Sequence, residues 1–252
     1  MQPLTDLDGI KARFIAARGY WRPWTDAMLR ANPGFLAHYA EYAGHPAKTG
    51  PLPPRMVELI YVALDASATH LFEAGLTTHL RMAREAGATD ADVFDVLHLV
   101  TMQGLSAVLH AADLLHEAAP QPPLNPEDAL RARIATLWPD QADRLLRLAA
   151  MDPGYVAVLL DFLEHGAPAG GLTRAERLLV RVALHACFTQ GDMETTRALI
   201  NEGLAQGVTR QALLQAIQLG AHLAVHGAAL GATVHARLIG PCRSLLKRAD
   251  YP

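Results

Sequence analysis

The sequence predicts an all-α fold, and three observations lead to it. Alanine, leucine and arginine dominate the chain, while runs of β-branched residues are scarce. Proline, threonine and glycine fall where helices would begin or end. The same order of these landmarks returns after 120 positions. With 51% apolar and 19% charged residues, the 252-residue chain has material for a large core and is not a disordered protein.

The chain aligns with itself without a gap when it is shifted by 120 positions. The segment NPGFLAHYAEYAGH pairs with DPGYVAVLLDFLEH, and GPLPPRMVELIYVALDASAT pairs with GGLTRAERLLVRVALHACFT. Pro-Gly, Val-Ala-Leu and Gly-x-Thr landmarks all match at this one offset. We therefore predict two tandem copies of one helical unit, joined through the proline-rich stretch APQPPLNP, and a tail: residues 1–119, 120–239 and 240–252.

The first two helices of copy 1 have clear boundaries. A helix opens at Pro53-Pro54, because the first helical turn tolerates proline, and runs to about Ser67. A second helix covers about 71–86. It ends at Gly87, since glycine readily takes the positive φ of a helix C-terminus.

A third, long helix follows in each copy. Thr89 caps it in copy 1, with Asp92 placed three residues on for a capping box. We expect this helix to run to about Glu117. Copy 2 repeats the boundary signals at Thr173, Gly207 and Thr209.

Charge and cysteine content exclude several classes of protein. A net charge of −3 and a pI of about 6.4 give no basic footprint, so we expect neither nucleic acid nor a membrane as partner. Cys187 and Cys242 cannot form a disulfide framework, and no Cys-x-x-Cys is present. The start, MQPLTDLDGIKARF, carries acids where a signal peptide would be apolar, which favours a cytoplasmic location.

One uncharged segment tests that expectation. Between Arg210 and Arg237 there is no acidic or basic residue, a length that could cross a bilayer. Glutamines and histidines interrupt the segment, however, and polar groups are costly in lipid. We expect a helix buried inside the protein or between subunits.

The central stretch EAGLTTHLRMAREAGATDADVFDVLHLVTMQGLSAVLHAADLL resembles the carboxymuconolactone decarboxylase family, which is related to the AhpD-type alkylhydroperoxidases. The resemblance rests on His79 within a helix, on the Gly-Ala-Thr turn at 87–89 and on Gly-Leu-Ser at 104–106. Copy 2 carries the second landmark as QGVTRQALLQAIQLGAHLAVHGAA. The resemblance implies an AhpD-like helical fold and a small-molecule substrate.

The chain departs from the peroxidase branch of these proteins. That branch uses Cys-x-x-Cys-x-x-x-His, and counting back from His79 places Phe72 and Gly75 at the cysteine positions. Without paired thiols, thiol peroxidase activity is not expected. Copy 2 has neither cysteine nor histidine at the matching positions, which hold Asp192, Thr195 and Leu199.

His79 is the first candidate catalytic residue. Its neighbours one helical turn away are Gly75 and Ala83, so the imidazole would stand beside empty volume. The family position favours an acid–base role. The alternative is a core histidine that hydrogen-bonds a backbone carbonyl.

Two carboxylates are candidate partners of this histidine. Glu73 lies six residues before it, nearly two helical turns away. Glu58 lies on the preceding helix, where the peroxidase branch keeps a catalytic glutamate, although the matching position is Ile60. The alternative for both is a structural or solvated carboxylate.

Three further residues are candidates for substrate binding. Arg55, at the start of its helix, would hold a substrate carboxylate, with a surface arginine as the alternative. Phe72 and Met102, with Met82, would give the pocket an apolar lining.

The long helix of each copy also carries a polar stripe. His222 and His226, four residues apart, could share a metal, but no third ligand is identified, and we expect neither metal nor cofactor. The same conclusion applies to His110 with Asp113 and His116. A polar seam between packed helices or subunits explains the stripes equally well: Asp95, His98, Met102 and Ser106 in copy 1, and Gln215, Gln218, His222 and His226 in copy 2.

Three functions remain open. The first is a cofactor-free decarboxylase or isomerase of the carboxymuconolactone type, with His79 as proton donor. The second is another cyclisation or dehydration of a small molecule on the same scaffold, and the third is a non-catalytic binding protein. Single-copy relatives form rings of six, so the fused chain is expected to form a homotrimer with one site per chain, in copy 1.

Overall fold

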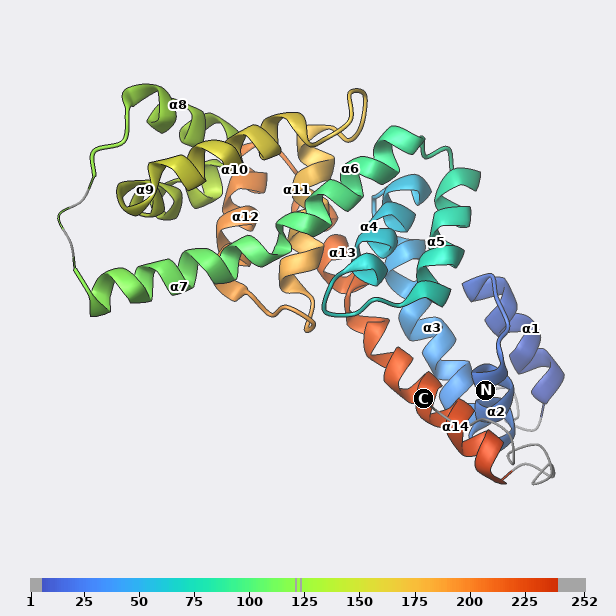
Figure 1. Ribbon diagram of the computed structural model, residues 1–252. Coiled ribbons are helices and arrows are strands. Elements are labelled where there is room, and N and C mark those ends of the chain that lie inside the picture. Colours follow the sequence, from blue (N-terminus) through green and yellow to red (C-terminus); the bar gives the residue numbers. More distant parts are fainter. Residues whose placement is uncertain (1–5, 121, 123, 240–252) are drawn as a thin grey trace. The chain divides into compact units, whose positions relative to one another are not determined.

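The computed structural model describes residues 6–120, 122 and 124–239 of the chain (Figure 1). Among these residues every element of regular secondary structure is a helix, which confirms the predicted all-α class. The predicted tail at 240–252, with Cys242, lies outside the described residues.

The chain divides into two compact units, 1–49 with 221–252, and 50–220. These units do not follow the predicted boundaries 1–119 and 120–239. The physical reason is an exchange of the last helices: α14 (Val225–Ile239) packs with the N-terminal helices, and α7 (Leu105–Ala118) packs with helices that follow it.

The first unit contains α1 (Leu7–Arg18), α2 (Pro23–Ala31), α3 (Pro33–Thr49) and α14. Its core is aromatic, with Phe14 at the centre and the rings of Trp21 and Trp24 packed edge to face against it at 5.7 and 6.0 Å. Val225 and Ala229 of α14 complete this core. The last helix is therefore held by burial of its apolar side chains.

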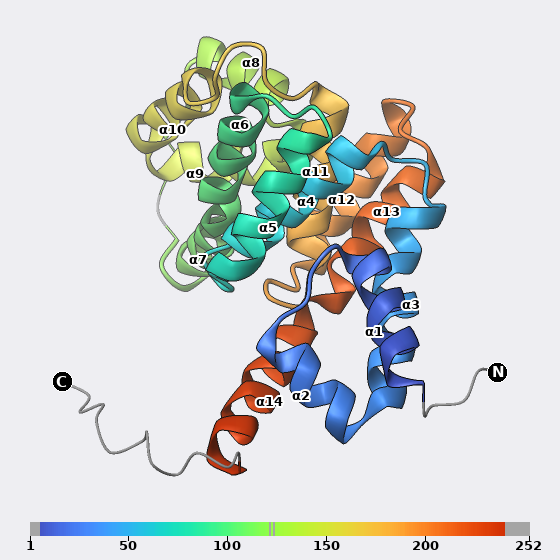
Figure 2. The ribbon, with the colours of Figure 1, turned by 90° about the vertical axis from the view of Figure 1, so that its right-hand side faces the viewer.

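At the centre of the second unit lies α4 (Pro54–Ala66), in which most side chains are buried. It packs against α5 (Glu73–Glu85), α6 (Asp90–Thr101) and α11 (Arg174–Ala186), as Figure 2 shows. Around α11 lie α12 (Met193–Ala205) and α13 (Arg210–Leu219).

A second apolar cluster of this unit joins α7 to three later helices, α8 (Asp128–Leu137), α9 (Ala142–Met151) and α10 (Pro153–His165). Leu109, Ile134 and Leu160 are almost wholly buried in it. Two short 3₁₀ turns, Met102–Gly104 and Pro139–Gln141, lie beside this cluster.

The predicted helix boundaries are largely confirmed. Pro54 begins α4, Gly87 follows α5 with φ at +91°, and Thr89 forms a capping box with Asp92. Copy 2 repeats these devices, since Thr173 caps α11, Gly207 has a φ of +82°, and Thr209 caps α13.

The third helix of copy 1, predicted to run to about Glu117, is a helical run over 90–118 that contains a 3₁₀ turn. The 3₁₀ turn Met102–Gly104 separates α6 from α7, and Ala221–Ala224 stands between α13 and α14 along the chain. The backbone tightens there from four-residue to three-residue hydrogen bonding.

The helix boundaries recur at the offset of the sequence repeat. α4 spans 54–66 and α11 spans 174–186; α5 spans 73–85 and α12 spans 193–205. Each pair is displaced by 120 positions, so equivalent residues of the two copies are placed on equivalent helices.

One helical run in the described part of the chain, 90–118, is long and apolar enough to cross a membrane by length and composition. Half of its most apolar window is buried inside the protein, as in the core helix of a globular domain. The run also carries the buried polar residues Asp92, Asp95 and His98.

Candidate active site

A hydrogen-bonded acid–base pair joins α4 and α5. Nδ1 of His79 lies 2.7 Å from Oε2 of Glu58, and both side chains are 12% exposed. An ionised carboxylate can only accept, so Nδ1 carries the hydrogen and donates it. This fixes the tautomer and the orientation of the ring. Nε2 of His79 remains the nitrogen for exchange of a proton with a ligand.

A second carboxylate faces the other side of the imidazole. Oδ2 of Asp65 lies 4.0 Å from Nε2 of His79, and Asp65 is buried. The ring of Tyr61 packs against the imidazole at 4.5 Å between centroids. The histidine therefore stands between two carboxylates of α4, with an aromatic ring against one face.

Gly75 makes this approach possible. A Cβ atom at this position would lie 2.2 Å from Oδ2 of Asp65 and 2.5 Å from Cδ1 of Phe72, closer than atoms can pack. The volume predicted to be empty beside His79 is thus occupied in part by the carboxylate of Asp65. A side chain at the position of the second peroxidase cysteine would displace that carboxylate.

A further histidine lies at the same carboxylate. Nε2 of His70 is 3.8 Å from Oδ1 of Asp65, and the His70 and Phe72 rings are 5.9 Å apart. Burial lowers the pKa of His70 below its ordinary value. Burial therefore favours the neutral form of this second imidazole.

The structure distinguishes the two predicted carboxylate partners. Glu58 contacts His79, whereas Glu73 is exposed in the first turn of α5, with its backbone carbonyl accepting from Thr77. Ile60, the position matching the family glutamate, is fully buried. Glu73 is thus not the residue that orients the imidazole.

Asp65 and Tyr61 were not predicted. Tyr61 follows Glu58 on α4 after three residues and Asp65 after seven, and these spacings place all three side chains on one face of the helix. After Arg55, the segment PRMVELIYVALDA is apolar apart from its two acids and Tyr61, and this pair of acids was the signal that could have indicated Asp65.

Arg55 has a different role from the predicted one. Its guanidinium bonds both carboxylate oxygens of Asp92, at 3.1 and 2.5 Å, and Oε1 of Glu176 at 2.5 Å. The hydrogen bond to Asp92 is the main cause that raises the pKa of Arg55 above its ordinary value. The residue links α4, α6 and α11, so its donors are already engaged.

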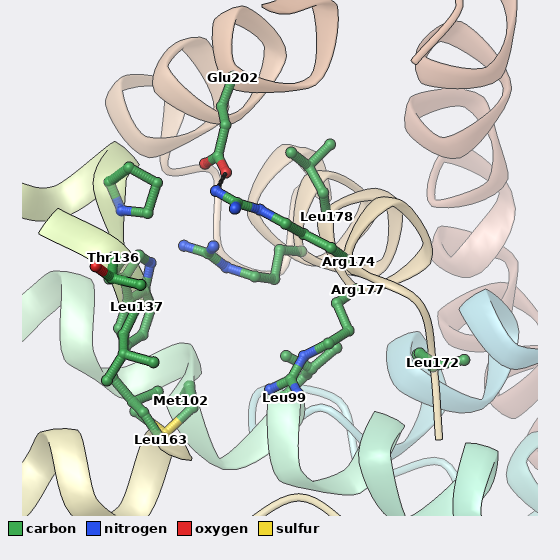
Figure 3. A pocket seen from close by; sticks show the side chains of 13 residues that line it. Leu99, Met102, Thr136, Leu137, Leu163, Leu172, Arg174, Arg177, Leu178 and Glu202 are labelled. Carbon is green, nitrogen blue, oxygen red and sulfur yellow. Dashed lines mark hydrogen bonds and ion pairs between the residues drawn. The ribbon is translucent and has the colours of Figure 1, made fainter. Parts of the chain in front are cut away.

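Phe72 and Met102, which were predicted to line one pocket, lie at different places in the structure. Phe72 immediately precedes α5 and contacts the Gly75 position. Met102 is buried in the 3₁₀ turn after α6 and lines another cavity, together with Leu99 and Trp138 (Figure 3). Of the two, only Phe72 lies beside the acid–base pair.

The polar stripe of α6 forms a seam between helices. Asp95 accepts from the backbone N–H of Leu172 at 2.9 Å, and Nε2 of His98 donates to the carbonyl of Phe162 at 3.1 Å. Farther along, His110 contacts Glu194 at 3.0 Å and Asp113 pairs with Arg147 at 2.7 Å. The side chain of His222 lies outside the described residues, so its pairing with His226 stays untested.

Copy 2 places different polar residues at the equivalent positions. Leu178 and Leu199, equivalent to Glu58 and His79, are buried and apolar. Nearby, Nδ1 of His185 lies 3.5 Å from Oδ2 of Asp192, and this contact is the main cause that lowers the pKa of Asp192. The second copy therefore lacks the acid–base pair of the first and has a buried contact between a histidine and a carboxylate instead.

Residues 33–117 match the sequence model of the carboxymuconolactone decarboxylase family. This region carries the whole Glu58, Asp65 and His79 cluster, and the match agrees with the resemblance predicted from the sequence. The fold is also that of a crystal structure from Burkholderia xenovorans LB400, whose assignment as a gamma-carboxymuconolactone decarboxylase subunit is provisional. The TM-score is 0.83 at 25% identity, over 94% of this chain and 98% of that one. No match was found among curated proteins.

Proposed function

We propose that the chain is a cofactor-independent carboxy-lyase that acts on a small carboxylated lactone or a related molecule. The observation that carries this proposal is the 2.7 Å contact between Glu58 and His79, a buried acid–base pair inside the family-matched region. A role of the decarboxylase type is the family-level expectation. The carboxylated lactone as substrate and its decarboxylation as reaction are what we propose beyond that expectation.

The residues support one proton transfer. In the reaction, the bond from the substrate carbon to its carboxylate breaks, CO₂ leaves, and the electron pair passes through the conjugated system onto the lactone carbonyl oxygen. His79 then gives a proton from Nε2 to carbon, while Glu58 holds Nδ1. An imidazolium there has a carboxylate at each nitrogen, since Asp65 lies on the Nε2 side. Solvent returns the proton to His79.

A second candidate function has one observation in its favour. The acids Glu58 and Asp65 border His79, and Arg55, the cation expected to bind a substrate carboxylate, is engaged by Asp92 and Glu176. Such surroundings suit a neutral carbonyl substrate, in which His79 would remove and return a proton in an isomerisation or dehydration.

One experiment separates the two candidates. Purified protein is incubated in D₂O with 4-carboxymuconolactone, and separately with the same lactone ring lacking the carboxylate. Release of CO₂ with one deuterium incorporated supports the lyase. Deuterium exchange into the neutral lactone without loss of CO₂ supports the second function. Activity on neither compound, in protein that is shown to be folded, contradicts both assignments for this substrate class.

A further inference from the structure

A cavity of about 350 Å³ lies within the second unit, on the α11 side. Its lining does not include Glu58, Asp65 or His79. Much of the lining is apolar. α6, α8, α10 and the turns beside them contribute Leu99, Met102, Leu137, Trp138 and Leu163, and Leu172 and Leu178 add to this part.

Three arginines from one face of α11 form the polar part. Arg174, Arg177 and Arg181 are separated by three and four residues, a spacing that aligns side chains along a helix. Figure 3 shows Arg174 and Arg177 extending from α11 toward the space, with Leu137 and Leu163 on the opposite side. Cationic and apolar groups thus face each other across the cavity.

Each of the three arginines has a partner at the cavity. Glu202 is the acidic residue in the lining and bonds Arg174 at 3.1 Å. Arg177 lies 3.5 Å from Asp95, which stands outside the lining, and also contacts Nδ1 of His98 at 3.4 Å. The guanidinium of Arg181 lies over the ring of Trp138, 4.6 Å from its centroid. Among the described residues of the lining there are thus three guanidinium groups and the carboxylate of Glu202.

We propose that this cavity is a binding site for a small aromatic or unsaturated carboxylate, separate from the acid–base pair at His79. Guanidinium groups bind planar carboxylates through two parallel hydrogen bonds, and the apolar wall covers a flat hydrocarbon body. The volume lies at the small end of the range for ligand pockets. The Trp138 ring, already stacked by Arg181, supplies a face for that body.

The test uses the full-length protein and phthalate as the probe, with inorganic phosphate and benzene-1,2-dimethanol as comparison compounds. Isothermal titration calorimetry should show saturable binding of phthalate, with at least tenfold weaker binding of phosphate and of the neutral diol. Tryptophan fluorescence should change over the same concentration range, and this change should be lost in Trp138→Phe. Equal binding of phosphate and phthalate would overturn the assigned ligand class.

Variants locate the binding. Arg181→Gln and Arg174→Gln should each weaken phthalate binding tenfold or more, and Arg181→Lys should recover part of the loss. Arg81→Gln is the matched control, because Arg81 forms an exposed pair with Glu85 and lies outside the cavity lining. Arg174 is 64% exposed, so its substitution leaves the fold intact even if Arg181→Gln does not.

His79→Gln distinguishes this site from the proposed active site. Phthalate binding should be unchanged in this variant, whatever its effect on turnover. Loss of phthalate binding in His79→Gln, or unchanged affinity in both arginine variants, would overturn the proposal.

Discussion

Glu58 and His79 stand 21 positions apart, on separate helices, and their side chains meet at 2.7 Å. Neither residue is in the first or last turn of its helix, so the packing of α5 on α4 sets the contact. A rigid pair of this kind is suited to holding one imidazole nitrogen while the other exchanges a proton.

Removal of His79 should lower turnover strongly without unfolding the protein. His79→Gln is expected to lower kcat by about 10²-fold or more, the usual contribution of a positioned acid–base group. Glu58→Gln should have a smaller effect than Glu58→Ala, because the amide oxygen still accepts from Nδ1. Steady-state kinetics with circular dichroism as the folding control measures both. Glu73→Gln is the matched control and should leave kcat unchanged.

Gly75→Ala should destabilise the site. The new Cβ would lie 2.2 Å from Oδ2 of Asp65, so the carboxylate must move, at a cost of about 1–3 kcal/mol in the free energy of unfolding. Urea denaturation measures this cost. Gly104→Ala is the control: φ there is −68° and no atom lies within 4 Å of the added Cβ, so we expect a change below about 0.5 kcal/mol. Equal stability of the two variants would contradict the close approach of Asp65.

Arg55 should stabilise the fold and should not bind the substrate. Arg55→Met leaves Asp92 and Glu176 without their common partner and should lower the free energy of unfolding by about 2 kcal/mol. Breaking a fully buried ion pair costs about 3–5 kcal/mol. We expect a smaller loss of unfolding free energy here, because a quarter of the Arg55 side chain is exposed. Where the variant folds, KM for a carboxylated substrate should be that of the natural sequence. A tenfold rise in KM with unchanged stability would restore the substrate-binding role.

Stability should fall as the pH drops below about 6.5, in part through His98. Burial lowers the pKa of His98 from its ordinary value of 6.5, and Nδ1 accepts from Arg177. The unfolded chain therefore binds a proton at a higher pH than the folded protein does. The stabilisation is fully present above pH 6.5 and is lost as the pH falls through the folded-state pKa. His98→Gln should flatten this part of the curve of unfolding free energy against pH, whereas His116→Gln, at an exposed position, should not.

The assembly remains a prediction. Light scattering should give a mass of about three times 27.2 kDa at micromolar concentration, as expected for fused copies of a ring-forming unit. α7 and α14 each expose large apolar side chains, among them Leu114, Leu115, Leu238 and Ile239, in accordance with burial in an assembly. A mass of one chain would exclude the trimer, and titration of two active sites per chain would exclude the expected asymmetry.

The sequence by itself determined the elements whose cause is local. The capping box of Thr89, the glycine at 87 and the proline at 54 each act through atoms within a few residues, so their positions predict where helices begin and end. The family resemblance also selected His79 from twelve histidines, by its place relative to Gly87.

Only the tertiary structure decided which side chains meet. Glu58 and Glu73 were equal candidates as partners of His79, because distance along the chain says nothing about how α5 lies on α4. The same holds for Arg55, whose two acids come from α6 and α11, 37 and 121 positions away. These contacts depend on long-range packing, in which burial of apolar faces fixes the helices and thereby the polar groups that they carry.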